Sequence, residues 1–263
     1  MCRHLAYLGP SRTLAEVLLA PEHGLLAQSY APADMRGGGT INADGSGAGW
    51  YSEPGADPVR VRSERALWAD TAFVALAGAT RATGMLAAVR SATTGMPVVS
   101  TANAPFVEGR WLFSHNGVVR GWPGTLAAAA AALPAVDLMT LDAPTDAAVL
   151  WALVRDRLRA GEDPGAVLGG TCVRVEQDAP GSRLNLLLTD GTTIWATAWR
   201  HALAVRTSGG PGRPGAPEVT VASEPTHAFP DWTQVPDRHL VVARPGRHEL
   251  YPLGETSPAA VAQ

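Results

Sequence analysis

The sequence predicts an α+β fold in which antiparallel sheets carry helices on their outer faces. Strand-like runs dominate the chain, turn sequences typical of hairpins join them, and at least two longer segments have helical spacing of apolar residues. With 263 residues, of which 46% are hydrophobic, the chain is long enough to bury one substantial core. We therefore expect a single domain over residues 2–254 and a disordered tail over residues 255–263.

The first half of the chain is expected to alternate strands with a helix and a loop. Residues 3–8 alternate polar and apolar side chains and predict a strand, and residues 11–20 predict a helix. The stretch 37–55 is rich in glycine and predicts a loop, because glycine permits positive φ and close approach of the backbone. Residues 84–93 and 110–119 predict two further strands bounded by turns.

The second half opens with a helix expected over residues 144–161, whose apolar side chains recur at helical spacing. Residues 182–199 predict a hairpin about Asp190 and Gly191. A two-residue hairpin turn needs positive φ at both central positions, which Asp-Gly tolerates. The elements expected after it are a loop and two strands, at residues 209–217, 218–223 and 239–245.

Composition and charge argue against several kinds of partner. The formal net charge is −3 and the 21 basic residues, all arginine, are scattered, so nothing predicts a surface for nucleic acid or an anionic membrane. The absence of a signal-like start and of a run of about 18 apolar residues favours a cytoplasmic protein. Cys2 and Cys172 lie in no zinc-like spacing, so we expect free thiols, no metal and no cofactor. The oligomeric state stays open.

Cys2 directly follows the initiator methionine. If Met1 is removed, as a small second residue permits, Cys2 carries a free α-amine beside its thiol. The ordinary pKa values, about 7.7–8.0 for the amine and about 8.5 for the thiol, let the two groups exchange a proton near neutral pH. One residue then supplies both a nucleophile and its base. The alternative is an ordinary small residue near a frayed chain end.

Four further residues carry groups suited to acyl transfer or to holding a charged substrate. Asn116 and Gly117 lie where an apolar strand closes, and they either offer an amide and a backbone N–H to an oxyanion or form a plain turn. Arg90 ends a strand of small residues, where a guanidinium binds a substrate carboxylate or pairs with an internal acid. Asp146 lies in the first turn of the helix expected at 144–161. Its carboxylate either accepts a hydrogen bond from a substrate ammonium or compensates the helix dipole.

Several motifs occur together in a characteristic order: MCRHLAYLG, NADGSGAGWY, VRSATTG, SHNGVV and PTDAAVLWALV. This set resembles class II glutamine amidotransferase domains, members of the N-terminal nucleophile hydrolase superfamily, over about residues 2–225. The resemblance implies a four-layer αββα sandwich with the amino terminus at the mouth of the site. The roles it implies are nucleophile for Cys2, oxyanion hole for Asn116 and the Gly117 N–H, and binding of the α-carboxylate of a glutamyl group by Arg90 and Thr93 and of its α-amine by Asp146.

Within this family, the stand-alone length, the opening motif and the VASEP stretch at 221–225 are similar to amidohydrolases of ergothioneine biosynthesis. That similarity implies a small-molecule γ-glutamyl substrate, γ-glutamyl-hercynylcysteine S-oxide, whose amide is hydrolysed to release glutamate. Because the leaving group carries a trimethylammonium, Trp50, Tyr51 and Trp68 are either an aromatic wall for it or core residues. Two alternatives remain open: a glutaminase subunit that supplies ammonia to a separate synthase, and a non-catalytic binding protein with the same fold.

Overall fold

The computed structural model describes residues 2–35, 41–210, 214–228 and 230–254, and it contains two antiparallel sheets. The strands of the first sheet are β1 Arg3–Thr13, β2 Ser46–Tyr51, β3 Val59–Ser63, β4 Arg81–Val89, β9 Ala204–Ser208, β10 Glu218–Ala222 and β11 Trp232–Gln234. Those of the second sheet are β5 Phe106–Glu108, β6 Trp111–Val118, β7 Arg183–Thr189, β8 Ile194–Ala198, β12 His239–Arg244 and β13 Arg247–Pro252. The spatial orders are β11-β9-β10-β1-β4-β2-β3 and β13-β12-β8-β7-β6-β5.

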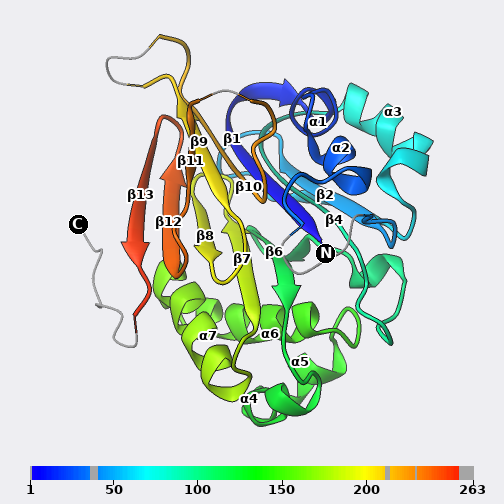
Figure 1. Ribbon diagram of the computed structural model, residues 1–263, viewed down its shortest axis with the longest axis vertical. Coiled ribbons are helices and arrows are strands. Elements are labelled where there is room, and N and C mark those ends of the chain that lie inside the picture. The colour runs from blue at the N-terminus through cyan, green and yellow to red at the C-terminus, as the bar shows by residue number, and fades with distance from the viewer. Residues whose placement is uncertain (1, 36–40, 211–213, 229, 255–263) are drawn as a thin grey trace.

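Helices cover the outer side of each sheet, as Figure 1 shows. Those beside the first sheet are α1 Leu14–Leu18, α2 Leu25–Tyr30 and α3 Thr71–Ala79. Those on the side of the second sheet are α4 Ala127–Ala131, α5 Ala135–Met139, α6 Asp146–Arg159 and α7 Pro164–Asp178. Short 3₁₀ turns occur at Leu67–Ala69, Ser100–Ala102 and Gly124–Leu126.

Three apolar layers hold the elements together, because successive residues of a strand point to opposite faces. In β1, Ala6 and Leu8 face the second sheet and pack between the sheets, whereas Leu5 and Tyr7 pack beneath α1 and its neighbours. The outer face of the second sheet packs against α6 and α7 in a separate cluster that includes Phe113. The layers are therefore helix, sheet, sheet and helix, which confirms the expected four-layer αββα sandwich.

The structure corrects the expected elements near the start of the chain. The first strand continues to Thr13, so it replaces the first part of the helix expected at 11–20. The expected loop at 37–55 contains β2, apart from residues 37–40, which lie outside the described residues. Glycine there serves packing between the layers, because a Cβ at Gly47 would lie 2.4 Å from the carbonyl oxygen of Ala104.

Later elements agree more closely with expectation. The helix expected at 144–161 is α6, and the hairpin expected at 182–199 is formed by β7 and β8. Its loop is longer than a two-residue turn, and Gly191 has a positive φ of 84° whereas Asp190 does not. The Asp190 carboxylate instead accepts hydrogen bonds from the backbone N–H groups of Thr192 and Thr193. The tail expected to be disordered lies outside the described residues.

Candidate active site

Cys2 lies immediately before β1, the strand that runs between β10 and β4 in the first sheet. The register places Arg3 opposite Val89 of β4, and Leu5 opposite Ala222 of β10. The Cys2 side chain is partly exposed, and its Sγ lies 3.7 Å from the carbonyl oxygen of Ser91. The start of β1 therefore brings this thiol to the place where β4 ends.

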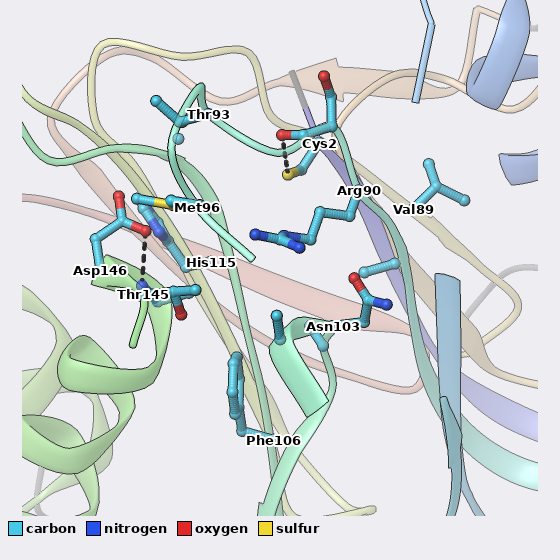
Figure 2. Close-up of a pocket in the computed structure, with 16 residues that line it drawn as sticks. Cys2, Val89, Arg90, Thr93, Met96, Asn103, Phe106, His115, Thr145 and Asp146 are labelled. Carbon is cyan, nitrogen blue, oxygen red and sulfur yellow. Dashed lines mark hydrogen bonds between the residues drawn. The ribbon is translucent and has the colours of Figure 1, made fainter. Parts of the chain in front are cut away.

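A cavity opens beside Cys2, and most of the residues predicted to form the site line it (Figure 2). Its walls come from the end of β4 and the turn after it, the segment 102–104, the end of β6 and the first residues of α6. The predicted residues that line it are Cys2, Arg90, Thr93, Gly117 and Asp146. Cys2 and Asp146, which are 144 positions apart in the chain, thus share one small space.

The Arg90 guanidinium lines this cavity and forms no ion pair with a described residue. The side chain is buried, Nη1 donates to the carbonyl oxygen of Pro97 at 2.8 Å, and Nη2 has no hydrogen-bond partner. In the described part of the chain, Arg90 forms no ion pair, so it does not pair with an internal acid. A buried charged donor without a partner is unfavourable, and a carboxylate is the ligand that a guanidinium matches best.

Asp146 faces Arg90 from the opposite wall (Figure 2). It is the first residue of α6, but Thr145 is the N-cap and its side chain accepts from the Ala148 N–H. The Asp146 carboxylate accepts from the N–H groups of Val119 at 3.0 Å and Ala147 at 2.8 Å, which fixes its orientation. A cation on one wall and an anion on the other match the carboxylate and ammonium of an α-amino acid.

The structure separates the two residues predicted to form the oxyanion hole. Gly117 lines the cavity, and the position requires glycine because a Cβ would lie 1.9 Å from the carbonyl oxygen of Arg183. Asn116 is fully buried and does not line the cavity; its Nδ2 donates to Ser223 Oγ at 2.9 Å, and its Oδ1 has no partner. Adjacent residues of a strand face opposite sides, which explains the separation.

Two histidines lie close to the site, although the sequence indicated no role for either. His115 lines the cavity, with Nε2 3.1 Å from the carbonyl oxygen of Arg183. His4 is fully buried with Nδ1 3.1 Å from Ser114 Oγ, and burial, together with the nearby His115 and His201, lowers its pKa to about 3. The His4 ring is therefore uncharged at neutral pH.

A buried ion pair fixes the backbone of Cys2, and sequence reasoning missed it. Arg3 donates to the Glu224 carboxylate, to the carbonyl oxygen of Asp34 and, through Nη1 at 3.0 Å, to that of Cys2. Glu224 also accepts from the Ala33 N–H at 2.8 Å and pairs with His23 Nε2 at 2.7 Å. Glu224 belongs to the VASEP stretch, which was the only signal for it in the sequence.

None of Trp50, Tyr51 and Trp68, the residues considered as a wall for the leaving group, lines this cavity. Tyr51 is buried between the sheets, and its hydroxyl donates to the carbonyl oxygens of Arg110 and Thr189. Trp68 is 41% exposed, and its ring meets that of Tyr30, the last residue of α2, edge to face. Nearness to a glycine-rich stretch in sequence did not place these rings at the site.

Both cysteines are free thiols, as the sequence predicts. Among the described residues, no group of three or more histidine, cysteine, aspartate and glutamate side chains is arranged to hold a metal ion. None of the helices in the described segments combines the length and apolar character needed to cross a membrane.

Solved structures share this architecture, although a scan against models of protein families found no match. The chain superposes on a glutamine aminotransferase class-II domain protein from Silicibacter pomeroyi with a TM-score of 0.67 and 22% identity, over 96% of this chain and 100% of that one. It superposes on the glutamine phosphoribosylpyrophosphate amidotransferase of B. subtilis with a TM-score of 0.63 and 14% identity, over 97% of this chain and 50% of that one. The fold is that of class II glutamine amidotransferase domains.

Sequence similarity to two mycobacterial enzymes shows which family the chain belongs to. The chain is 42% identical over 253 residues to the γ-glutamyl-hercynylcysteine sulfoxide hydrolase of Mycolicibacterium smegmatis, over 96% of this chain and 100% of that protein. It is 41% identical over 241 residues to the enzyme of the same name from Mycobacterium tuberculosis H37Rv, over 92% of each chain. The chain belongs to the γ-glutamyl-hercynylcysteine sulfoxide hydrolase family, which confirms the resemblance drawn from its motifs.

Proposed function

We propose that the protein hydrolyses the γ-glutamyl amide bond of γ-glutamyl-hercynylcysteine S-oxide and releases glutamate and hercynylcysteine S-oxide. The names of the relatives support this substrate, and the cavity beside Cys2 supports the chemistry. The observation that carries the proposal is the unpaired Arg90 guanidinium opposite the Asp146 carboxylate, in a cavity that ends at the Cys2 thiol. This arrangement fits a glutamyl group with its γ-carbonyl at the sulfur.

The glutamyl group is held by its head group in this proposal. Arg90 and the Thr93 hydroxyl take the α-carboxylate, and Asp146 takes the α-ammonium. The γ-carbonyl then lies between the Cys2 thiol and the Gly117 N–H. Fixing both ends of the group converts attack on the carbonyl into an effectively intramolecular step.

Cys2 attacks once its α-amine is free. The amine takes the thiol proton, the sulfur bonds to the γ-carbon, and the carbonyl oxygen gains negative charge. The Gly117 N–H stabilises that charge from within the cavity. The second donor in this proposal is the free N–H of the Asn116 amide, which must reach the oxyanion from outside the cavity wall, where its other N–H is bound to Ser223. The ammonium returns the proton to the amide nitrogen as the C–N bond breaks, and hercynylcysteine S-oxide leaves.

Water completes the cycle. It attacks the thioester while the Cys2 amine takes a proton from it, and the C–S bond breaks to give glutamate. The sulfur regains its proton, so the enzyme returns to its starting state. The Cys2 amine thus carries the proton in both halves of the cycle.

Steady-state kinetics on two substrates tests the proposal. We expect kcat/KM for γ-glutamyl-hercynylcysteine S-oxide to exceed that for glutamine by about 100-fold or more, because only the former has a large leaving group to bind. Preference for glutamine would favour the alternative in which the protein supplies ammonia to a separate synthase. Absence of turnover with both substrates would favour a binding protein.

A further inference from the structure

We propose that a second cavity, on the other side of Cys2 from the glutamyl cavity, binds the hercynyl part of the leaving group. This inference rests on the proposed function. The second cavity has a volume of about 550 Å³, within the usual range for small-molecule sites. Residues that define it include His23, Asp34, Ser223, Glu224, His227 and Gln234.

The strand order places the two cavities on opposite sides of the nucleophile. The glutamyl cavity is lined by residues at the end of β4, Val89 and Arg90 among them, whereas the second is lined by residues that follow β10 and by the segment 33–35. Because β1 runs between β4 and β10, its first residue, Arg3, lies between the strand ends that line the two cavities, and Cys2 directly precedes it. A substrate with its head group at Arg90 and its carbonyl at Cys2 extends its nitrogen substituent towards the β10 side.

Direct hydrogen bonds join the wall of the second cavity to the reacting centre. Ser223 Oγ accepts from Asn116 Nδ2 at 2.9 Å. Arg3 donates both to the carbonyl oxygen of Cys2 and to the Glu224 carboxylate. The wall of the second cavity is therefore bonded directly to Arg3, the neighbour of Cys2, and to Asn116.

The wall of the second cavity suits a cation that cannot donate hydrogen bonds. Asp34 and Glu224 contribute carboxylates, and the charge of the buried Glu224 is offset by its pairing with Arg3 and His23. The His227 ring meets Trp232 edge to face, and burial together with Arg206 lowers the His227 pKa, which keeps the ring neutral. A carboxylate attracts a trimethylammonium group by electrostatics without needing a hydrogen-bond donor from it, and a neutral imidazole does not repel it.

A bulky substitution in the second cavity tests its assignment. Ala228 is exposed on its wall, so Ala228→Trp fills the space without disturbing the core. We expect the ratio of kcat/KM for γ-glutamyl-hercynylcysteine S-oxide to that for glutamine to fall by about tenfold, because glutamine has only ammonia to lose. The matched control is Ala75→Trp on the exposed face of α3, which leaves the ratio unchanged. An unchanged ratio in Ala228→Trp overturns the inference.

Double inhibition of the wild-type protein gives an answer that needs no variant. Glutamate and hercynine, the trimethylated histidine, are added together while hydrolysis of the γ-glutamyl substrate is followed. Separate cavities predict that both bind at once, whereas mutually exclusive binding contradicts the inference. Failure of the wild type to hydrolyse the sulfoxide would instead contradict the proposed function. In that case the inhibition by glutamate and hercynine would be followed with glutamine as the substrate. The two failures are therefore distinguishable.

Discussion

The two cysteines of the chain lie in opposite surroundings. Cys2 precedes β1 at a cavity and is partly exposed, whereas Cys172 lies inside α7 with no exposed surface. The Cys172 thiol is in contact with Leu184 O at 3.6 Å and Thr197 Oγ1 at 3.5 Å, and burial raises its pKa to about 12. Because the thiolate is the nucleophile, Cys172 is inert near neutral pH. The two thiols therefore differ in reactivity because Cys2 lines a cavity and is partly exposed, whereas Cys172 is buried.

Substituting each cysteine produces the largest contrast. Cys2→Ala removes the proposed nucleophile, and we expect kcat to fall by about 10⁴-fold or more. Cys172→Ala removes a small buried group, so kcat/KM stays within about twofold while the free energy of unfolding falls by about 1 kcal/mol. Enzyme kinetics and urea denaturation measure the two effects. Substantial activity in Cys2→Ala would end the assignment of the nucleophile.

Asn116→Ala tests whether the buried amide acts on the transition state, as proposed. We expect kcat to fall by about 10²–10³-fold with little change in KM, because an oxyanion donor acts mainly on the transition state. Ser223→Ala leaves the amide but removes its 2.9 Å partner, so a smaller loss of about tenfold is expected. A kcat that stays at the wild-type level in Asn116→Ala would leave the Gly117 N–H as the proposed donor.

Arg90→Met tests binding of the head group. We expect KM to rise by about 30- to 100-fold with a smaller change in kcat, because the guanidinium contacts a part of the substrate that does not react. Arg62→Met is the matched control, since Arg62 pairs with Asp142 and does not line the cavity. Equal kinetic effects of the two substitutions would show that Arg90 acts only through folding.

The smallest expected effect is the pH dependence of stability at Cys172. Its folded-state pKa, about 12, lies above the ordinary value near 9, so above about pH 9 the unfolded thiol loses its proton first. Stability is therefore full below about pH 9 and falls as pH rises, with a slope of at most about 1.4 kcal/mol per pH unit. Urea denaturation between about pH 8.5 and 10 should give a shallower slope in Cys172→Ala than in Cys2→Ala. Identical slopes would contradict the burial argument.

The sequence predicted the elements that have a regular apolar repeat, and it did not predict those in which glycine interrupts that repeat or suggests a loop. Helix α6 has a regular apolar repeat, whereas α7 contains Gly165, Gly169 and Gly170, which weaken the helical signal. In α7 a Cβ at Gly169 would lie 2.7 Å from Leu253, so close packing explains that glycine. A glycine required by tertiary contact looks the same in sequence as one required by a turn.

The site was predictable where the residue type itself indicates the chemistry. Cys2, Arg90 and Asp146 could be singled out because a thiol, a guanidinium and a carboxylate in those positions suggest binding and attack. The pairing of Arg3 with Glu224 could not be predicted, since it joins residues 221 positions apart. Which way Asn116 points also depends on strand pairing, which the sequence alone does not fix.

Mass spectrometry of the active enzyme tests most directly whether Cys2, with its own α-amine, is the nucleophile. The protein is treated with a diazoketone analogue of glutamine, whose terminal carbon alkylates a neighbouring thiol as N₂ is lost. The modified peptide is then sequenced. We expect the mature chain to begin at Cys2 with the adduct on that residue, its formation prevented by excess glutamate. Fully active protein that retains Met1, or an adduct on Cys172, would contradict the account.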